Sequence, residues 1–270
     1  MCAVHPNHAR MVNVPALPEP TATAVAHDRK RVRYAVLGAA ALLAGIWIAW
    51  TSAWLLGWSI DDLGIRPRTV GGLIGILTAP LAHASFAHLM SNTLPLALLA
   101  TLTLYCYPLG ARRAIPLIWI LSGIGVWLFA RPSVHVGASG IAHGLMFFLF
   151  FTGLLRRDRL SIVTALVVFF LYGGMLLSVL PQEQHVSFEY HLAGAVAGVL
   201  SALLFFRSDP APPRKRYSWE DEGDDETPSE GELELPRPKE VPVLWQRPPN
   251  DTGEDRVIRF ARRDGESARS

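Results

Sequence analysis

A serine between small residues is the first point in this sequence where residue types and spacing could support chemistry. Gly137-Ala138-Ser139-Gly140 opens an apolar run that continues to Leu155. Ser139 is thus expected where a loop becomes a helix, and the first-turn N–H groups of a helix have no partners inside it. Such groups can stabilise an oxyanion that forms near a serine. Small residues at this position also serve for packing or capping, so the motif alone does not indicate catalysis.

A serine hydroxyl is a weak nucleophile and needs a base within hydrogen-bond reach. Imidazole suits this task because its pKa lies near neutrality. His191 is the candidate base, and no aspartate lies inside the predicted membrane spans to orient it, so we expect a Ser–His dyad. His88 and Asn92 are four residues apart and share a helix face. With the backbone N–H of Ser139, their side chains could serve as oxyanion donors.

The elements that must position these residues are apolar segments. Half of the 270 residues are hydrophobic, and runs of about 20 apolar residues indicate membrane helices. The segment from Val70 to Phe86 is broken by Pro80 and His83, so we expect it to lie in the interface or to re-enter the membrane. The predicted spans are Tyr34–Trp58, His88–Tyr107, Ala114–Ala130, Ser139–Leu155, Leu160–Leu180 and Phe188–Phe206.

The flanking charges predict the orientation of these six spans. Thirteen Arg and Lys residues flank the ends on one side, against Arg66, Arg68 and Arg131 on the other. The positive-inside rule then places both termini in the cytoplasm. We expect an integral protein of the bacterial inner membrane. The thirteen are Arg29, Lys30, Arg31, Arg33, Arg112, Arg113, Arg156, Arg157, Arg159, Arg207, Arg214, Lys215 and Arg216.

The two ends of the chain differ in composition from the apolar middle. Residues 1–33 are expected to be a flexible basic leader without a cleavable signal peptide. Residues 34–206 are expected to form an all-α, six-helix core embedded in the membrane. Residues 207–270 are rich in proline and charge, with an acidic block from Glu220 to Glu234, which predicts a disordered tail.

Topology predicts that the polar residues of the even-numbered spans meet. Spans two, four and six run in the same direction, so their first residues lie at one membrane level. Ionisable groups at membrane depth are costly and are usually functional. Gly140 and Gly144 on the fourth span, and Gly194 and Gly198 on the sixth, have the spacing of helix faces that approach closely. If those faces pack together, Ser139 and His191 meet across the seam.

The combined pattern resembles the rhomboid family of intramembrane serine proteases. The matching residues are His83-x4-His88-x3-Asn92, Gly137-x-Ser139-Gly140-x3-Gly144 and His191-x2-Gly194-x3-Gly198, each on the expected span. The resemblance implies a six-helix core in which Ser139 is the nucleophile and His191 the base. It further implies that His88 and Asn92 line the oxyanion hole, that His83 lies near the cavity, and that Gly137 belongs to the active-site lining. The implied substrates are transmembrane segments of membrane proteins.

This sequence departs from the family pattern at two places. Many bacterial members carry a Trp-Arg pair in the first large loop, where this chain has Arg66-Pro67-Arg68. Many also have an aromatic residue four positions after the serine, where this chain has His143. We expect His143 to be a neutral stacking or hydrogen-bonding partner of His191. His135 and His185 are expected to be ordinary loop residues on the outer side.

Two other functions remain open at this point. Bis-His ligation of haem or a metal by His88 and His191 would leave the serine motif unexplained, and the HExxH motif of zinc proteases is absent. A catalytically inactive rhomboid-like protein that binds membrane helices is the other alternative. We expect no cofactor and no metal; the expected partners are the lipid bilayer and membrane-protein substrates, with no nucleic acid.

Overall fold

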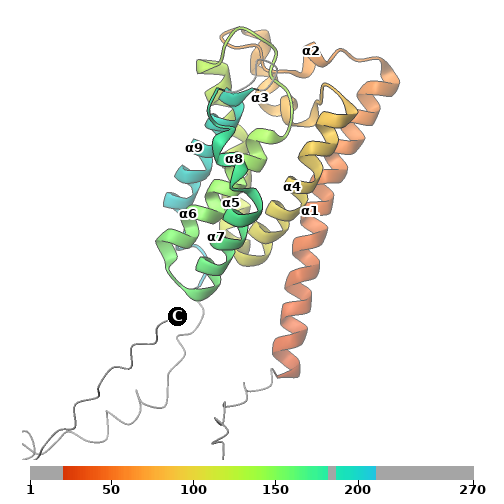
Figure 1. Ribbon diagram of the computed structural model, residues 1–270. Coiled ribbons are helices and arrows are strands. Elements are labelled where there is room, and N and C mark those ends of the chain that lie inside the picture. Colours follow the sequence, from red (N-terminus) through yellow and green to blue (C-terminus); the bar gives the residue numbers. More distant parts are fainter. Residues whose placement is uncertain (1–20, 182–186, 211–270) are drawn as a thin grey trace, which may run out of the picture. The chain divides into compact units, whose positions relative to one another are not determined.

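The computed structural model describes residues 21–181 and 187–210, and over these ranges the chain is α-helical with one isolated backbone bridge between Ile65 and His135. Six apolar helices are long enough to cross a membrane, which confirms the predicted all-α membrane bundle (Figure 1). They are α1 (Ala22–Leu56), α4 (Phe86–Cys106), α5 (Pro108–Phe129), α6 (Ser139–Arg156), the span of α7 (Arg159–Tyr172) and α8 (Gly174–Leu177), and α9 (Phe188–Phe205). Four short helical segments lie between α1 and α4: α2 (Ile60–Leu63), η1 (Gly71–Leu73), α3 (Gly75–Thr78) and η2 (Ala79–Leu81).

Three boundaries differ from those expected from hydropathy. Helix α1 begins at Ala22, within the expected leader, because Thr21 caps it by accepting a hydrogen bond from the Ala24 N–H. Helix α5 begins at Pro108, so Arg112 and Arg113 lie inside it rather than before it. Residues 207–210 of the expected tail are ordered against the core: Asp209 accepts hydrogen bonds from the N–H groups of Leu109 and Gly110 at 2.9 and 2.8 Å. Residues 1–20 and 211–270 lie outside the described ranges.

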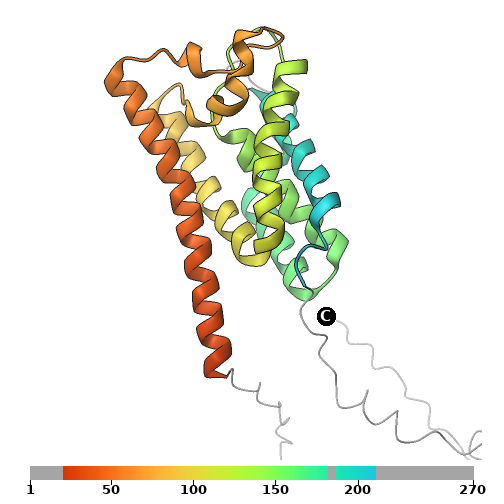
Figure 2. The same cartoon turned by 180° about the vertical axis from the view of Figure 1, so that it is seen from behind.

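Helix α6 is the central helix of the bundle. In the 18-residue apolar stretch of this helix, 61% of the residues are buried inside the protein. The corresponding share is at most 39% in any other span. Helix α9 packs along it, α5 packs against both, and α1 contacts mainly α4, as the two opposite views show (Figures 1 and 2). The helix that begins with Ser139 is therefore surrounded by the helices that carry the other candidate residues.

The predicted glycine seam between α6 and α9 is present. A Cβ atom added at Gly194 would meet the carbonyl oxygen of Gly140, and one added at Gly198 would meet that of Gly144. The two backbones are therefore in direct contact, which only glycine at these positions permits. This contact sets the distance between the N-terminal ends of α6 and α9.

The segment from α2 to η2 holds the loop that leads into α6. Ile65 and His135 exchange backbone hydrogen bonds of 2.9 and 3.0 Å, and the Gly137 N–H donates to the Ala79 carbonyl at 2.9 Å. The stretch predicted to lie in the interface or re-enter the membrane thus forms short helices. Their role in the fold is to anchor the backbone immediately before Ser139.

We predict that Gly194→Ala lowers the melting temperature of the purified protein, because its methyl group would force α9 away from α6. Overpacking of this kind costs roughly 1–3 kcal/mol. Gly45→Ala on α1 is the matched control, since nothing lies within 4 Å of a Cβ there. Thermal unfolding in detergent measures both variants. Equal melting temperatures for Gly194→Ala and Gly45→Ala would contradict the close contact.

Candidate active site

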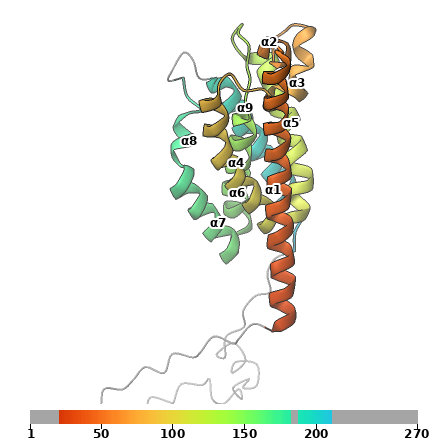
Figure 3. The same cartoon turned by 90° about the vertical axis from the view of Figure 1, so that its right-hand side faces the viewer.

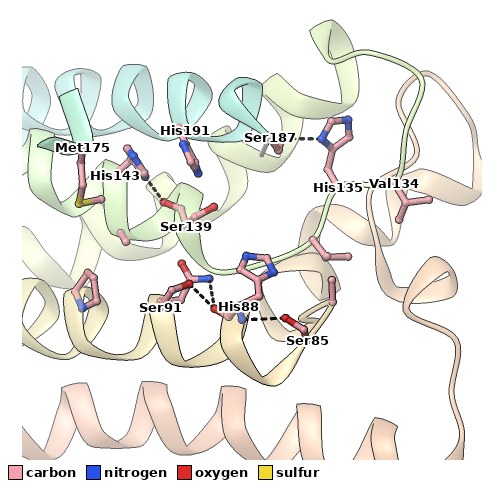
Figure 4. Close-up of a pocket in the computed structure, with 15 residues that line it drawn as sticks. Ser85, His88, Ser91, Val134, His135, Ser139, His143, Met175, Ser187 and His191 are labelled. Carbon is pink, nitrogen blue, oxygen red and sulfur yellow. Dashed lines mark hydrogen bonds between the residues drawn. The ribbon is translucent and has the colours of Figure 1, made fainter. Parts of the chain in front are cut away.

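A cavity of about 590 Å³ lies at the N-terminal ends of α4, α6 and α9. Five of the predicted site residues line it, together with four further polar residues (Figure 4). The other two predicted residues, His83 and Gly137, lie behind this lining. The predicted lining residues are His88, Asn92, Ser139, His143 and His191, and the additional ones are Ser85, Ser91, His135 and Ser187.

Ser139 is half-buried and is the first residue of α6. Its N–H therefore has no acceptor within the helix. Gly137, two residues earlier, has a φ of 110°, and a Cβ there would lie 2.7 Å from the His88 ring. Glycine is required at this position for both reasons, backbone conformation and space. The tight approach brings the Ser139 loop against the His88 side chain.

The ring of His191 is held by a backbone carbonyl. Its Nδ1 lies 3.0 Å from the Ser178 carbonyl oxygen, which can only accept a hydrogen bond. Nδ1 therefore carries the hydrogen, and Nε2 keeps its lone pair. The ring extends from α9 toward Ser139 (Figure 4). Among the described residues, no hydrogen bond joins the Ser139 hydroxyl to His191; such bonds are often long in unliganded sites and tighten with substrate bound.

His143 stacks on His191, which is the contact expected from its position one helical turn after Ser139. The ring centroids are 4.0 Å apart and the planes differ by 12°. Its Nδ1 donates to the Ser139 carbonyl at 2.7 Å, and its Nε2 lies 2.7 Å from the Ser178 hydroxyl. That hydroxyl also lies 2.9 Å from the Met175 carbonyl, so its single hydrogen is shared between two acceptors. Ser178 thus contacts both imidazoles from one side.

His88 and Asn92 lie on the α4 face that lines the cavity. The Asn92 amide donates one hydrogen to the His88 carbonyl at 3.1 Å. The second N–H of the same amide takes no part in this bond. His83 is only 1% exposed, packs beside His88 with ring centroids 5.1 Å apart, and accepts from the Ala138 N–H at 3.4 Å. His83 therefore supports the loop before Ser139 and the His88 ring from behind.

His135 is more than the ordinary loop residue that we expected, because it is only 2% exposed. Its Nε2 lies 3.1 Å from the Arg131 carbonyl and is thus the protonated nitrogen. Its Nδ1 accepts from the Ser187 hydroxyl at 2.7 Å, and Ser187 in turn caps α9 by accepting from the Tyr190 N–H. This chain of bonds ties the loop before Ser139 to the start of the helix that carries His191. His185 lies outside the described residues.

The sequence motifs did not identify Ser178, Ser187 or His135. Ser187 carries a recognisable signal, a serine directly before an apolar helix. Ser178 acts through its carbonyl as well as its hydroxyl, and a carbonyl has no sequence signature. Within residues 21–181 and 187–210, no group of three or more His, Cys, Asp or Glu side chains is placed to hold a metal ion.

We predict that acid weakens the fold through His83 and His135. Burial, with a smaller contribution from His88, lowers the pKa of His83 from 6.5 to about 4, and burial also lowers the pKa of His135. The unfolded chain binds more protons below pH 6.5, so stability is full above that pH and falls as the pH drops toward 4. For His83 alone the loss approaches roughly 3 kcal/mol below pH 4.

Melting temperatures between pH 7.5 and 5 measure this dependence. His83→Gln and His135→Gln should each flatten it, whereas His27→Gln, at an exposed position of α1, should not. If neither buried-histidine variant changes the dependence of the melting temperature on pH, the acid sensitivity comes from other groups.

Comparison with known proteins places this architecture in a family. The profile of the Rhomboid domain matches residues 70–208. An uncharacterized protein of Mycobacterium tuberculosis is 41% identical over 207 residues, which cover 72% of this chain and 83% of that protein. One of Mycobacterium leprae is 36% identical over 179 residues, covering 62% and 68%. A protein of Acanthamoeba polyphaga mimivirus, named as a candidate rhomboid protein, is 29% identical over 145 residues, covering 51% and 78%. Six apolar helices, a polar cavity at the start of α6 and this domain match together show that the chain belongs to the rhomboid family.

Proposed function

We propose that this protein is an intramembrane serine endopeptidase that cleaves transmembrane segments of other membrane proteins. Ser139 is the nucleophile and His191 the general base. The observation that carries the proposal is the bond from His191 Nδ1 to the Ser178 carbonyl, because it leaves Nε2 unprotonated on the ring that extends toward Ser139. A base with that tautomer can accept the serine proton.

In the acylation step, Ser139 Oγ attacks the carbonyl carbon of the scissile peptide while its proton passes to His191 Nε2. The imidazolium then gives this proton to the leaving amine, and the C–N bond breaks to leave an acyl-enzyme. A water molecule hydrolyses the ester, with His191 acting as base again. The Ser178 carbonyl has the orienting role that an aspartate has in a triad. It carries only a partial negative charge, so it stabilises the imidazolium less than a carboxylate would.

The negative charge of the tetrahedral intermediate falls on the substrate oxygen. The Ser139 N–H at the start of α6, the second N–H of the Asn92 amide and a ring N–H of His88 are the donors that we assign to it. All three belong to residues that line one cavity. Donors fixed before the reaction stabilise this charge without reorganisation.

The membrane setting limits the substrate to a segment that reaches the N-terminal ends of α6 and α9. Six apolar helices make the chain an integral membrane protein, and the mycobacterial relatives point to a bacterial membrane. The excess of Arg and Lys at the opposite ends of the helices supports cytoplasmic termini, with the cavity near the outer face. Cleavage is then expected near the outer end of a substrate helix.

We predict that Ser139→Ala and His191→Ala each abolish cleavage of a labelled transmembrane substrate in liposomes. The double variant should be no worse than either single variant, because the two groups act as a unit. Ser91→Ala is the matched control: Ser91 lines the same cavity, but its hydroxyl donates to the His88 carbonyl at 2.8 Å. Labelling by a fluorophosphonate probe should be lost in Ser139→Ala and in His191→Ala, because the probe reacts with a serine activated by its base, and should be retained in Ser91→Ala. An unlabelled, inactive wild type would instead favour the helix-binding, catalytically inactive alternative.

We predict that Asn92→Ala lowers kcat by ~10²–10³-fold with little change in KM, because the amide meets charge mainly in the transition state. Initial rates across substrate concentrations separate the two constants. The melting temperature, measured on the same sample, reports the loss of the Asn92–His88 bond. A change confined to KM would make Asn92 a substrate-binding or packing residue.

A further inference from the structure

A second cavity, of about 610 Å³, lies at the end of the bundle opposite Ser139, between α1 and the turn that joins α4 to α5. Its lining combines cations with an apolar wall. Lys30 and Arg31 of α1 and Arg112 of α5 contribute the charge, and Ala35, Leu104 and Leu109 contribute apolar surface. This cavity is separate from the candidate active site, and the proposed peptidase chemistry uses none of its residues.

The length of α1 creates this groove. Its 35 residues span roughly 52 Å, well beyond a hydrocarbon core of about 30 Å. Its N-terminal turns therefore extend past the ends of the neighbouring helices (Figures 1 and 3). Further along, α1 and α4 come together, because a Cβ at Gly38 would lie 2.8 Å from Leu104. The groove is open at the polar end and closes at this contact.

The cations of the groove are not neutralised within the described part of the chain. None of the ion pairs between described residues includes Lys30, Arg31 or Arg112. Arg31 is held in place, since it donates to the carbonyls of Tyr105 and Cys106 at 2.6 and 3.1 Å. Asp209 is the one carboxylate among the described lining residues, and both of its oxygens accept hydrogen bonds, from the N–H groups of Leu109 and Gly110. Among the described lining residues, three positive charges thus face the groove against one negative charge.

We infer that this groove binds an anionic phospholipid, with the phosphate head group at Lys30 and Arg112 and an acyl chain along Leu104 and Leu109. Basic pockets between helices at the cytoplasmic side are suited to such head groups, and the lipids of that leaflet are negatively charged. The apolar wall distinguishes a lipid from a free phosphate. It also argues against the acidic segment 220–234 of this chain as the occupant, because that segment has a single large apolar residue, Leu233.

The test uses the full-length protein in a neutral detergent and reads lipid binding, so it is independent of proteolysis. Phosphatidylglycerol and phosphatidylcholine are titrated while the melting temperature and lipid retention in native mass spectrometry are recorded. Phosphatidylglycerol should stabilise the wild type more than phosphatidylcholine does. In Lys30→Gln/Arg112→Gln its apparent affinity should fall on the order of ten- to thirty-fold, as expected for two cations near a membrane surface.

The matched control is Arg29→Gln/Arg33→Gln, which removes the same charge from exposed positions of α1 outside the groove. It should retain the wild-type preference for phosphatidylglycerol. Equal losses in the two double variants would overturn the inference in favour of diffuse surface charge. Glycerol phosphate added alone should stabilise the protein much less than the lipid. If it matched the lipid, the groove would be a site for soluble phosphate, and the lipid assignment would fail.

Discussion

The direct contact of the α6 and α9 backbones is the constraint on which the rest of this structure depends. Gly194 lies against the Gly140 carbonyl and Gly198 against that of Gly144, so neither helix can shift without opening or overpacking the seam. This contact fixes the distance between the helices that carry Ser139 and His191. The other helices and loops pack around α6 and α9, whose separation is determined by these glycines.

Two sets of hydrogen bonds position the side chains at the end of the bundle that contains the cavity. His135 and Ser187 connect the loop before Ser139 to the cap of α9. Ser178 contacts His191 through its carbonyl and His143 through its hydroxyl. The two imidazoles are therefore stacked and oriented by a hydroxyl and backbone carbonyls, and among the described residues neither ring forms a hydrogen bond to a carboxylate. An ionised aspartate would be costly to bury at membrane depth, whereas a backbone carbonyl adds no net charge and still specifies which nitrogen carries the hydrogen.

The opposite end of the bundle is held by charged side chains. Arg156 donates to the carbonyls of Phe206 and Asp209 at 2.9 and 2.8 Å and pairs with Asp158 at 2.9 Å. Asp209 caps the start of α5. These bonds attach the end of α9 to α5 and α6, so the helix carrying His191 is fixed at both ends. Polar bonds suit this end of the bundle because the ends of membrane helices lie near water and head groups, whereas the middle of the seam is formed by close backbone contact at its glycines.

The sequence alone determined the six apolar spans and the motifs on spans two, four and six, because hydropathy and glycine spacing are local properties of the chain. Its charge asymmetry predicts the direction of those spans. The sequence could also indicate that Ser139, His191, His88 and Asn92 share one level, since topology follows from the count of spans. Only the tertiary structure decided the tautomer of His191, the burial of His135 and the place of His83 behind the cavity. Each depends on contacts between residues distant in sequence, and in two cases on a backbone carbonyl, a group that every residue carries and no motif reveals.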